Sequence, residues 1–483
     1  MVDPVPALVA LAAALIVFAW VGVRAARHRG DLEDYLVARD SQAPGVLSLS
    51  FLASGLGAWI LFAPPEVGAV VGLDGVAGYA VAAATPFAAL ALFGRRLRRV
   101  LPAGHTLTEF VRLRFGRAFH VYVVGVSVAY MLVFVTAELT AVGGITATLS
   151  GLDPRVGVTA VAAVTLAYTA YGGLRASLRT DCWQGWLLLG LVGVAAAALV
   201  AGVAVPAQGL TRTGLLAVDR VGVESAITLV LAVTAANLFH QGYWQRVWAA
   251  RDARALARGA TLAAVGCIPV VALVGAIGIL AAGSGVALGN PPVPFFALLA
   301  GLPAWIGIVV LVLAVSLVAS SVDTLESGLA ALVAVERPAM SLAAARLVTV
   351  ALVAPTVVAA LQGYSVLRQL LIADLLCATA VAPALLGLWR RATPAGALAG
   401  ALAGLAGAVA PGALATGSIA EGVLGATFPE AVPTLPPFLG AVAASTAVAV
   451  AVSLAGRRRT DLATMNERVT RLSGAPPRTR VDS

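Results

Sequence analysis

The chain has 483 residues, of which 60% are hydrophobic and only 11% are charged. A soluble protein of this length could not bury so much apolar surface, whereas a protein that crosses a bilayer many times does not need to. The net charge of +9 does not indicate a nucleic-acid partner, because the arginines lie in short runs between apolar stretches. The composition predicts an all-α polytopic membrane protein.

About thirteen stretches are long and apolar enough to cross the hydrocarbon core, which takes about 20 residues. We expect spans at 5–23, 45–72, 76–94, 118–148, 154–172, 181–205, 224–246, 259–282, 303–333, 341–361, 366–389, 394–414 and 436–456. Most arginines then fall on one side of the membrane. The positive-inside rule therefore predicts an integral protein of the cytoplasmic (inner) membrane with its N-terminus outside and its C-terminus inside.

The segments outside these spans are short. The leader before the first span is acidic and the arginines follow that span, so we do not expect a cleavable signal peptide. The stretch 412–434, rich in Gly and Pro, is predicted to be an outside loop. The polar tail 457–483 is too short to bury a core and is predicted to be disordered or surface-bound.

Two spans have features of broken helices. Span 45–72 contains Gly55, Gly57 and a pair of prolines, which weaken a helix. Span 224–246 carries several polar residues around His240. Irregular backbone at membrane depth is tolerated only where it lines a cavity. Because these spans are the first and sixth of ten once the leading helix is set aside, they predict an inverted repeat with a site at the midplane.

The span 303–333 contains a polar cluster, Ser320-Ser321-Val322-Asp323-Thr324. Placing two hydroxyls and a carboxylate in hydrocarbon is costly, so such a cluster normally marks an ion or solute path.

Five segments in this order resemble the sodium/solute symporter family, which includes proline, pantothenate and sugar symporters. They are DYLVAR at 34–39, TLTEF with RFG at 106–116, YGGLRA with TDCWQ at 171–184, QRVWAA at 245–250 and SSVD at 320–323. The resemblance implies thirteen helices, a LeuT-type core of five-plus-five inverted repeats, and alternating access. Its parts would be 1–44 (leading helix and cytoplasmic loop), 45–205 and 206–389 (the two halves), 390–456 (two trailing helices) and 457–483 (cytoplasmic tail).

The resemblance also implies a sodium site made of backbone oxygens and hydroxyls. Its ligands would be the backbone of Ala53, Leu56 and Leu317 and the side chains of Ser320 and Ser321. The alternative is that these serines bond back to the preceding turn of their own helix. Many relatives carry Asp or Asn where this chain has Gly55, so coupling to protons instead of sodium stays open.

Two aspartates near this site have open roles. In relatives, the residue equivalent to Asp181 lies on the ion's exit path; the alternative here is a solvated carboxylate paired with Arg175 or Arg179. Asp323 would either contribute to the field around the ion or anchor neighbouring helices.

The remaining candidates for solute binding or coupling are Trp59, Tyr130, Glu138, His240 and Gln241. Glu138 lies deep in its span and could carry a coupling proton or bind an ammonium group; the alternative is a pair with an arginine of a neighbouring helix. The two aromatic residues could wall a pocket, and the other two lie where relatives touch solute. For all four the alternative is ordinary packing.

These observations predict a secondary active transporter that uses sodium to move a small organic solute into the cell. An amino acid such as proline is the first candidate and a monocarboxylate the second; a proton-coupled symporter and a transporter-like solute sensor are the alternatives. We do not expect an enzyme, because none of the four histidines has a metal or catalytic partner at helical spacing. We expect no cofactor, with sodium, solute and lipid as partners of a functional monomer.

Overall fold

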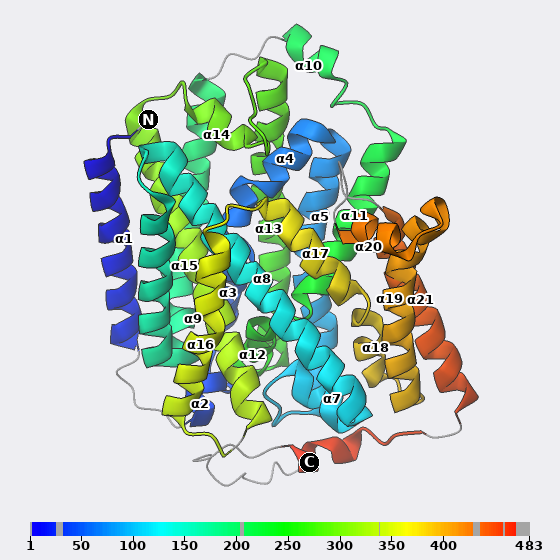
Figure 1. The fold of residues 1–483 in the computed structure, drawn as a ribbon. Helices are drawn as coiled ribbons and strands as arrows, with labels where there is room; N and C mark the ends of the chain where they lie inside the picture. Colours follow the sequence, from blue (N-terminus) through cyan, green and yellow to red (C-terminus); the bar gives the residue numbers. More distant parts are fainter. Residues whose placement is uncertain are drawn as a thin grey trace.

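The computed structural model describes residues 2–25, 32–202, 207–337, 339–427, 435–456 and 459–469, and over these residues it is a helical bundle without strands (Figure 1). In chain order its elements are α1 (Pro4–Ala25), α2 (Leu32–Val37), α3 (Pro44–Gly55), η1 (Ala58–Leu61), α4 (Ala63–Val70), α5 (Leu73–Ala89), η2 (Leu90–Gly94), α6 (Arg95–Val100), α7 (Leu107–Phe115), α8 (Arg117–Ser150), α9 (Pro154–Gly202), α10 (Ala207–Thr213), α11 (Arg220–Asn237), α12 (Gln241–Ala249), α13 (Ala253–Ser284), α14 (Pro294–Leu299), α15 (Ala304–Glu336), α16 (Leu342–Ala360), α17 (Val366–Ala378), α18 (Val381–Leu385), η3 (Leu386–Leu388), α19 (Pro394–Thr416), α20 (Ile419–Thr427), α21 (Leu435–Ala455) and η4 (Ala463–Arg468).

Ten helices of the described chain are long and apolar enough to cross a membrane. Two bent pairs raise the number to as many as 12: α3 with the segment 58–70, bent by 55°, and α17 with the segment 381–388, bent by 48°. The expected spans therefore coincide with helices of the structure, apart from small differences at their ends.

Helix α9, at 49 residues, contains two of the expected spans. The hydroxyls of Tyr168 and Thr180 both donate to the same oxygen of Asp323, over 2.7 and 3.0 Å. Twelve residues of straight helix would separate their backbones by about 18 Å, so the chain must reverse between them. It does so at Gly173, whose φ of 57° and ψ of −149° favour glycine. With α9 counted as two and each bent pair as one, the described chain has up to thirteen candidate membrane spans.

Both spans predicted to be broken are broken. The first changes direction between Gly55, the last residue of α3, and Ala58, the first of η1. In the second, α11 ends at Asn237 and α12 begins at Gln241, with a turn between them. The two breaks free backbone and polar groups in the interior of the bundle, where α8 and α15 also pass.

The arginine-rich loops gather at one end of the bundle. Arg39 donates to the carbonyl of Pro102 over 2.7 Å, Arg98 donates to the carbonyl of Val247 over 3.0 Å, and Arg114 donates to Thr460 Oγ1 over 2.9 Å. The N-terminal end of α1 lies at the opposite end of the bundle from η4 (Figure 1), as an odd number of crossings requires.

One expectation for the connecting segments changes, and for the tail the surface-bound alternative holds over the part that the structure describes. The stretch 412–434 was expected to be a loop. Instead, α19 extends to Thr416, and α20 is a helix that packs against α19. Residues 428–434 lie outside the described part. In the tail, residues 459–469 are bound to the bundle, with Met465 buried and Asn466 accepting a 3.0 Å bond from the amide of Ala103. Residues 457–458 and 470–483 lie outside the described part.

Candidate functional site

Helix α3 ends inside the bundle, which frees its last carbonyls. Its hydrogen-bond ladder closes with the amide of Leu56. The carbonyl of Ser54 instead accepts from Tyr243 Oη over 3.3 Å and from Ser321 Oγ over 3.4 Å. Ala53 and Leu56 are fully buried beside it. The helix end therefore presents carbonyl oxygens to α12 and α15, as a cation site needs.

The two serines of α15 face this helix end. Ser320 and Ser321 are fully buried, and Leu317 lies one turn earlier at 1% exposure. Ser320 Oγ donates to Asp181 Oδ1 over 2.6 Å and Ser321 Oγ to α3, so neither bonds back to its own helix. Ser316 on the same helix does bond back, to the carbonyl of Val312 over 2.7 Å.

Asp181 forms a buried ion pair with Arg246, at 2.7 Å with both side chains fully buried. Ser50 of α3 also donates to Asp181, and Arg246 donates to Ser50 Oγ over 2.7 Å and to Thr324 Oγ1 over 2.8 Å. Four helices thus meet at one charge pair. The expected alternative partners were wrong: among the described residues Asp181 pairs with neither Arg175 nor Arg179.

Asp323 holds the two arms of α9 against α15. It accepts hydrogen bonds from Tyr168 in the first arm and from Ser177, over 2.8 Å, and Thr180 in the second. All of these side chains are buried. Asp323 is therefore occupied by protein donors, one turn away from the serines.

Glu138 reaches from α8 to the start of η1. Its Oε2 accepts the amide of Ala58 over 2.8 Å, while Oε1 has no hydrogen-bond partner in the described part of the chain. A Cβ at Gly57 would lie 2.0 Å from Oε1 and 2.6 Å from Ser321 Oγ, so the carboxylate and the serine hydroxyl are within about 4.6 Å of each other. The expected alternative, a pair with an arginine, is not formed among the described residues.

His240 and Gln241 lie at the start of α12. The His240 ring stacks on Tyr243 with centroids 4.1 Å apart, and its ring nitrogens have no partner among the described residues. Gln241 donates to Ser127 Oγ over 3.0 Å and accepts the amide of Leu107 over 3.2 Å. Both side chains thus contact protein groups of α7, α8 and α12.

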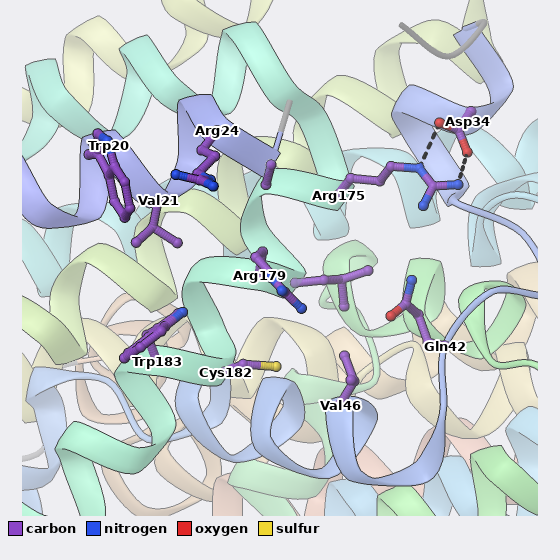
Figure 2. A pocket seen from close by; sticks show the side chains of 12 residues that line it. Trp20, Val21, Arg24, Asp34, Gln42, Val46, Arg175, Arg179, Cys182 and Trp183 are labelled. Atoms are coloured by element: carbon purple, nitrogen blue, oxygen red, sulfur yellow. Dashed lines mark hydrogen bonds and ion pairs between the residues drawn. The ribbon is translucent and has the colours of Figure 1, made fainter. Parts of the chain in front are cut away.

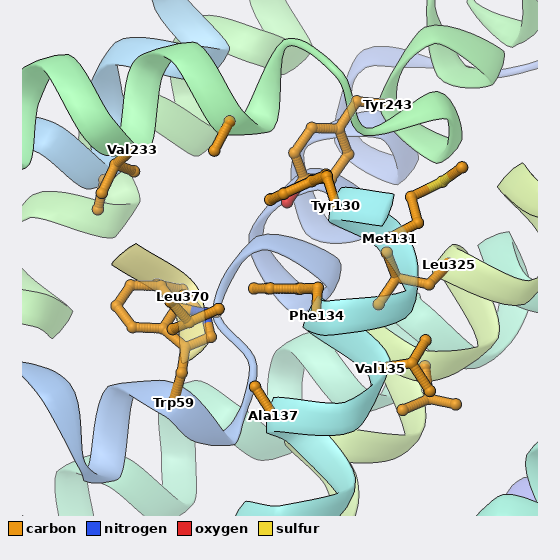
Figure 3. Packing of buried hydrophobic residues seen from close by; sticks show 14 of the residues in the cluster. Trp59, Tyr130, Met131, Phe134, Val135, Ala137, Val233, Tyr243, Leu325 and Leu370 are labelled. Atoms are coloured by element: carbon orange, nitrogen blue, oxygen red, sulfur yellow. The ribbon is translucent and has the colours of Figure 1, made fainter. Parts of the chain in front are cut away.

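A narrow cavity opens beside the two breaks. Figure 3 shows the packing around four of the residues that line it, Trp59, Tyr130, Phe134 and Tyr243. It extends from Gly55 to α17, and Trp59 and Tyr130 both line it. Its aromatic lining comes from α5, α8, α12 and η1 and consists of Trp59, Tyr79, Phe87, Tyr130, Phe134 and Tyr243. Trp59 stacks on Tyr79 with centroids 5.4 Å apart, and Tyr130 Oη donates to Asn237 Oδ1 over 3.3 Å. His240 and Gln241 do not line this cavity.

Asp374 of α17 also lines the cavity, and sequence reasoning missed it. The residue is 6% exposed, and none of the hydrogen bonds or ion pairs between the described residues involves its carboxylate. The signal was present, because Asp374 is an acid inside an expected span. Arg246 and Ser50 were also missed as partners of Asp181, since they lie far from it in sequence.

A second, wider cavity lies between α1, α3 and α9 (Figure 2). Arg24, Arg175 and Arg179 line it, and Arg175 holds Asp34 of α2 over 2.5 Å. None of the residues predicted for the sodium or solute site lines this cavity; Cys182, which follows Asp181 in α9, does line it. The narrow cavity, and not this one, adjoins the helix break.

Comparisons with known proteins identify the family of the chain. The sequence model of the sodium:solute symporter family matches residues 35–335. The chain is 30% identical to the spermidine transporter DUR31 of Candida albicans over 362 residues, 74% of this chain and 70% of that protein. It is 28% identical to the high-affinity proline transporter PutP of Bacillus subtilis over 177 residues, 35% of this chain and 37% of that protein.

Among solved structures, a sodium-coupled sialic acid symporter in its substrate-bound outward-open state is similar with a TM-score of 0.73 at 15% identity, covering 94% of this chain and 99% of that one. The nucleobase-cation symporter Mhp1 in a closed conformation is similar with a TM-score of 0.59 at 14% identity, covering 90% and 98%. At these identities the structures support the LeuT-type fold alone. The chain belongs to the sodium:solute symporter family, as a membrane-integral secondary active transporter of a solute.

Proposed function

We propose that the protein is a sodium-coupled symporter that carries a small organic solute into the cell by alternating access. The observation that carries this proposal is the meeting of the broken end of α3 with the two buried serines of α15. A sodium ion needs about five or six oxygens to replace its hydration shell. The backbone of Ala53, Leu56 and Leu317 with the hydroxyls of Ser320 and Ser321 would supply them.

Glu138 would supply the negative charge that Gly55 lacks. Its unpartnered Oε1 lies on the same side of Gly57 as Ser321 Oγ. A carboxylate at this distance favours a bound cation in the low-dielectric interior. The same free oxygen also favours the second candidate, in which Glu138 takes up the coupling proton; replacement by Gln separates the two.

Asp181 would receive the ion on its way inward. Ser320 donates directly to Asp181. Arg246 lies on the other side of Asp181, where it contacts Thr324, one turn further along α15 toward the arginine-rich end. For a cation to reach Asp181 from the serines, Arg246 has to move away, because its charge repels the ion. Inward opening would therefore break the pair between Asp181 and Arg246.

For the solute, an amino acid such as proline stays the first candidate, supported by the match to a proline transporter. The match to a spermidine transporter covers more of the chain and makes an amine the second candidate. We place the arginine-rich end in the cytoplasm, with the N-terminus outside and the C-terminus inside the cytoplasmic membrane. Residues 45–205 and 206–389 would be the two halves of the inverted repeat, working as a monomer without a cofactor.

The test is uptake of radiolabelled proline and of spermidine into proteoliposomes under an imposed inward sodium gradient. Ser321→Ala should raise the sodium concentration for half-maximal uptake roughly tenfold or more, because a buried hydroxyl ligand is worth about 1–3 kcal/mol. Ser316→Ala is the matched control, since Ser316 bonds only to its own helix, and should behave as the wild type. Unchanged sodium dependence in both Ser320→Ala and Ser321→Ala would contradict the proposal.

A further inference from the structure

The narrow cavity beside the break combines one acid with an aromatic wall. Asp374 is 6% exposed, lines the cavity and has no partner among the described residues. No basic side chain of the described chain lines the cavity with it. A buried carboxylate is costly unless it is paired or neutralised, so an ionised Asp374 would favour a cationic partner that enters the cavity from outside.

We propose that this cavity binds an ammonium group of the solute, with Asp374 as its counter-ion and the aromatic rings as its walls. The proposal rests on the proposed function, because it names the solute class of that transporter. Trp59, Tyr79 and Tyr130 present their rings to the same space as Asp374 (Figure 3 labels Trp59 and Tyr130). Aromatic faces attract cations within about 6 Å of the ring centre, most strongly where water is excluded.

The site disfavours a solute whose only charge is a carboxylate. The amide at the start of η1, which could receive such a group, already holds Glu138 through the bond from Ala58. A solute carboxylate in the cavity would have Asp374 beside it and no cationic partner from the described residues. Like charges at this separation repel strongly in a low-dielectric interior. The monocarboxylate candidate therefore fits this cavity poorly.

The cavity also adjoins the ion site. Tyr243 has its ring in the aromatic wall, and its hydroxyl donates to the Ser54 carbonyl over 3.3 Å. The same carbonyl accepts from Ser321. A solute that moves Tyr243 therefore moves an oxygen next to the proposed sodium ligands, and the ion and the solute can sense each other through this contact.

The experiment measures binding to detergent-purified protein by isothermal calorimetry, without any ion gradient. The probes are 1,4-diaminobutane, its uncharged counterpart 1,4-butanediol, and succinate. The wild type should bind the diamine roughly tenfold or more tightly than the diol or succinate. Asp374→Asn should lose most of this preference. Asp3→Asn, a control at an exposed aspartate near the N-terminus, should behave as the wild type.

Equal binding of the diamine and the diol by the wild type would overturn the inference, and so would an undiminished preference in Asp374→Asn. If that variant is misfolded by size-exclusion chromatography, the wild-type comparison of the probes still decides, and Asp374→Glu should retain the preference. Failure of the proposed function looks different: the diamine preference survives while uptake ignores the sodium gradient. Conversely, sodium-driven uptake that is indifferent to Asp374→Asn refutes only the ammonium site.

Discussion

Replacing Gly57 by alanine is the sharpest perturbation of the break. The backbone of Gly57 has φ −69° and ψ −176°, which any residue adopts, so the effect of a methyl group is steric alone. The new Cβ would lie 2.0 Å from Glu138 Oε1 and 2.6 Å from Ser321 Oγ. Ordinary contact begins near 3.4 Å, so the carboxylate oxygen has to retreat by about 1.4 Å and the hydroxyl by about 0.8 Å.

These shifts set the expected magnitude. A retreat of Glu138 breaks or stretches its 2.8 Å bond from the amide of Ala58. Hydrogen bonds to charged groups contribute about 1.5–3 kcal/mol, and every 1.4 kcal/mol is tenfold in an equilibrium constant. If this geometry holds the cation, Gly57→Ala should raise the half-saturating sodium concentration by roughly 10- to 100-fold.

The assay is sodium-dependent uptake in proteoliposomes, with Gly125→Ala as the matched control. A Cβ at Gly125 meets nothing within 4 Å, so this control adds the same methyl group to α8 without touching the site. The control should match the wild type in uptake and in yield of folded protein. If Gly57→Ala transports with unaltered sodium dependence, the carboxylate and the serine do not act together at the break, and the reasoning fails.

Two further substitutions test neighbouring parts of the site. Glu138→Gln keeps an acceptor for Ala58 but removes the ionisable group: a changed dependence of uptake on pH supports the proton role, and a raised half-saturating sodium concentration at an unchanged pH profile supports the charge beside sodium. If neither changes, Glu138 is a packing residue. Arg246→Gln leaves Asp181 buried without its counter-charge, which should lower the free energy of unfolding by about 3–5 kcal/mol in denaturant titrations. Adding Asp181→Asn should recover part of that loss, and additive losses would show that the pair is not coupled.

The spans could be predicted because a helix that crosses the bilayer needs a long apolar stretch, which is visible directly in the sequence. The break in the first core helix was also predictable, since Gly57 and the following prolines weaken the helix locally. The reversal inside α9 followed from the two apolar stretches, but its position at Gly173 depends on the φ of 57° that the fold imposes there. Local composition therefore predicts the positions of the membrane spans better than the positions of the turns between them.

The partners of buried charges could not be predicted in the same way. Arg175 and Arg179 are close to Asp181 in sequence, yet Arg246, 65 residues away, is the partner, because α12 and α9 meet beside α3. Asp374 met the same criterion as Glu138, an acid within a span. Its place in the cavity becomes visible only when α5, α8, α12 and η1 bring aromatic rings, and no basic side chain, to it. Such pairings depend on tertiary packing, which a single sequence does not encode locally.

The most direct test of the central claim is binding of radioactive sodium to the purified transporter, measured by scintillation proximity without any gradient. The wild type and Ser316→Ala should bind sodium saturably, and Ser321→Ala should lose that binding over the same concentration range. Absence of saturable binding in the wild type, or equal binding in all three proteins, would contradict a cation held between the end of α3 and the serines of α15.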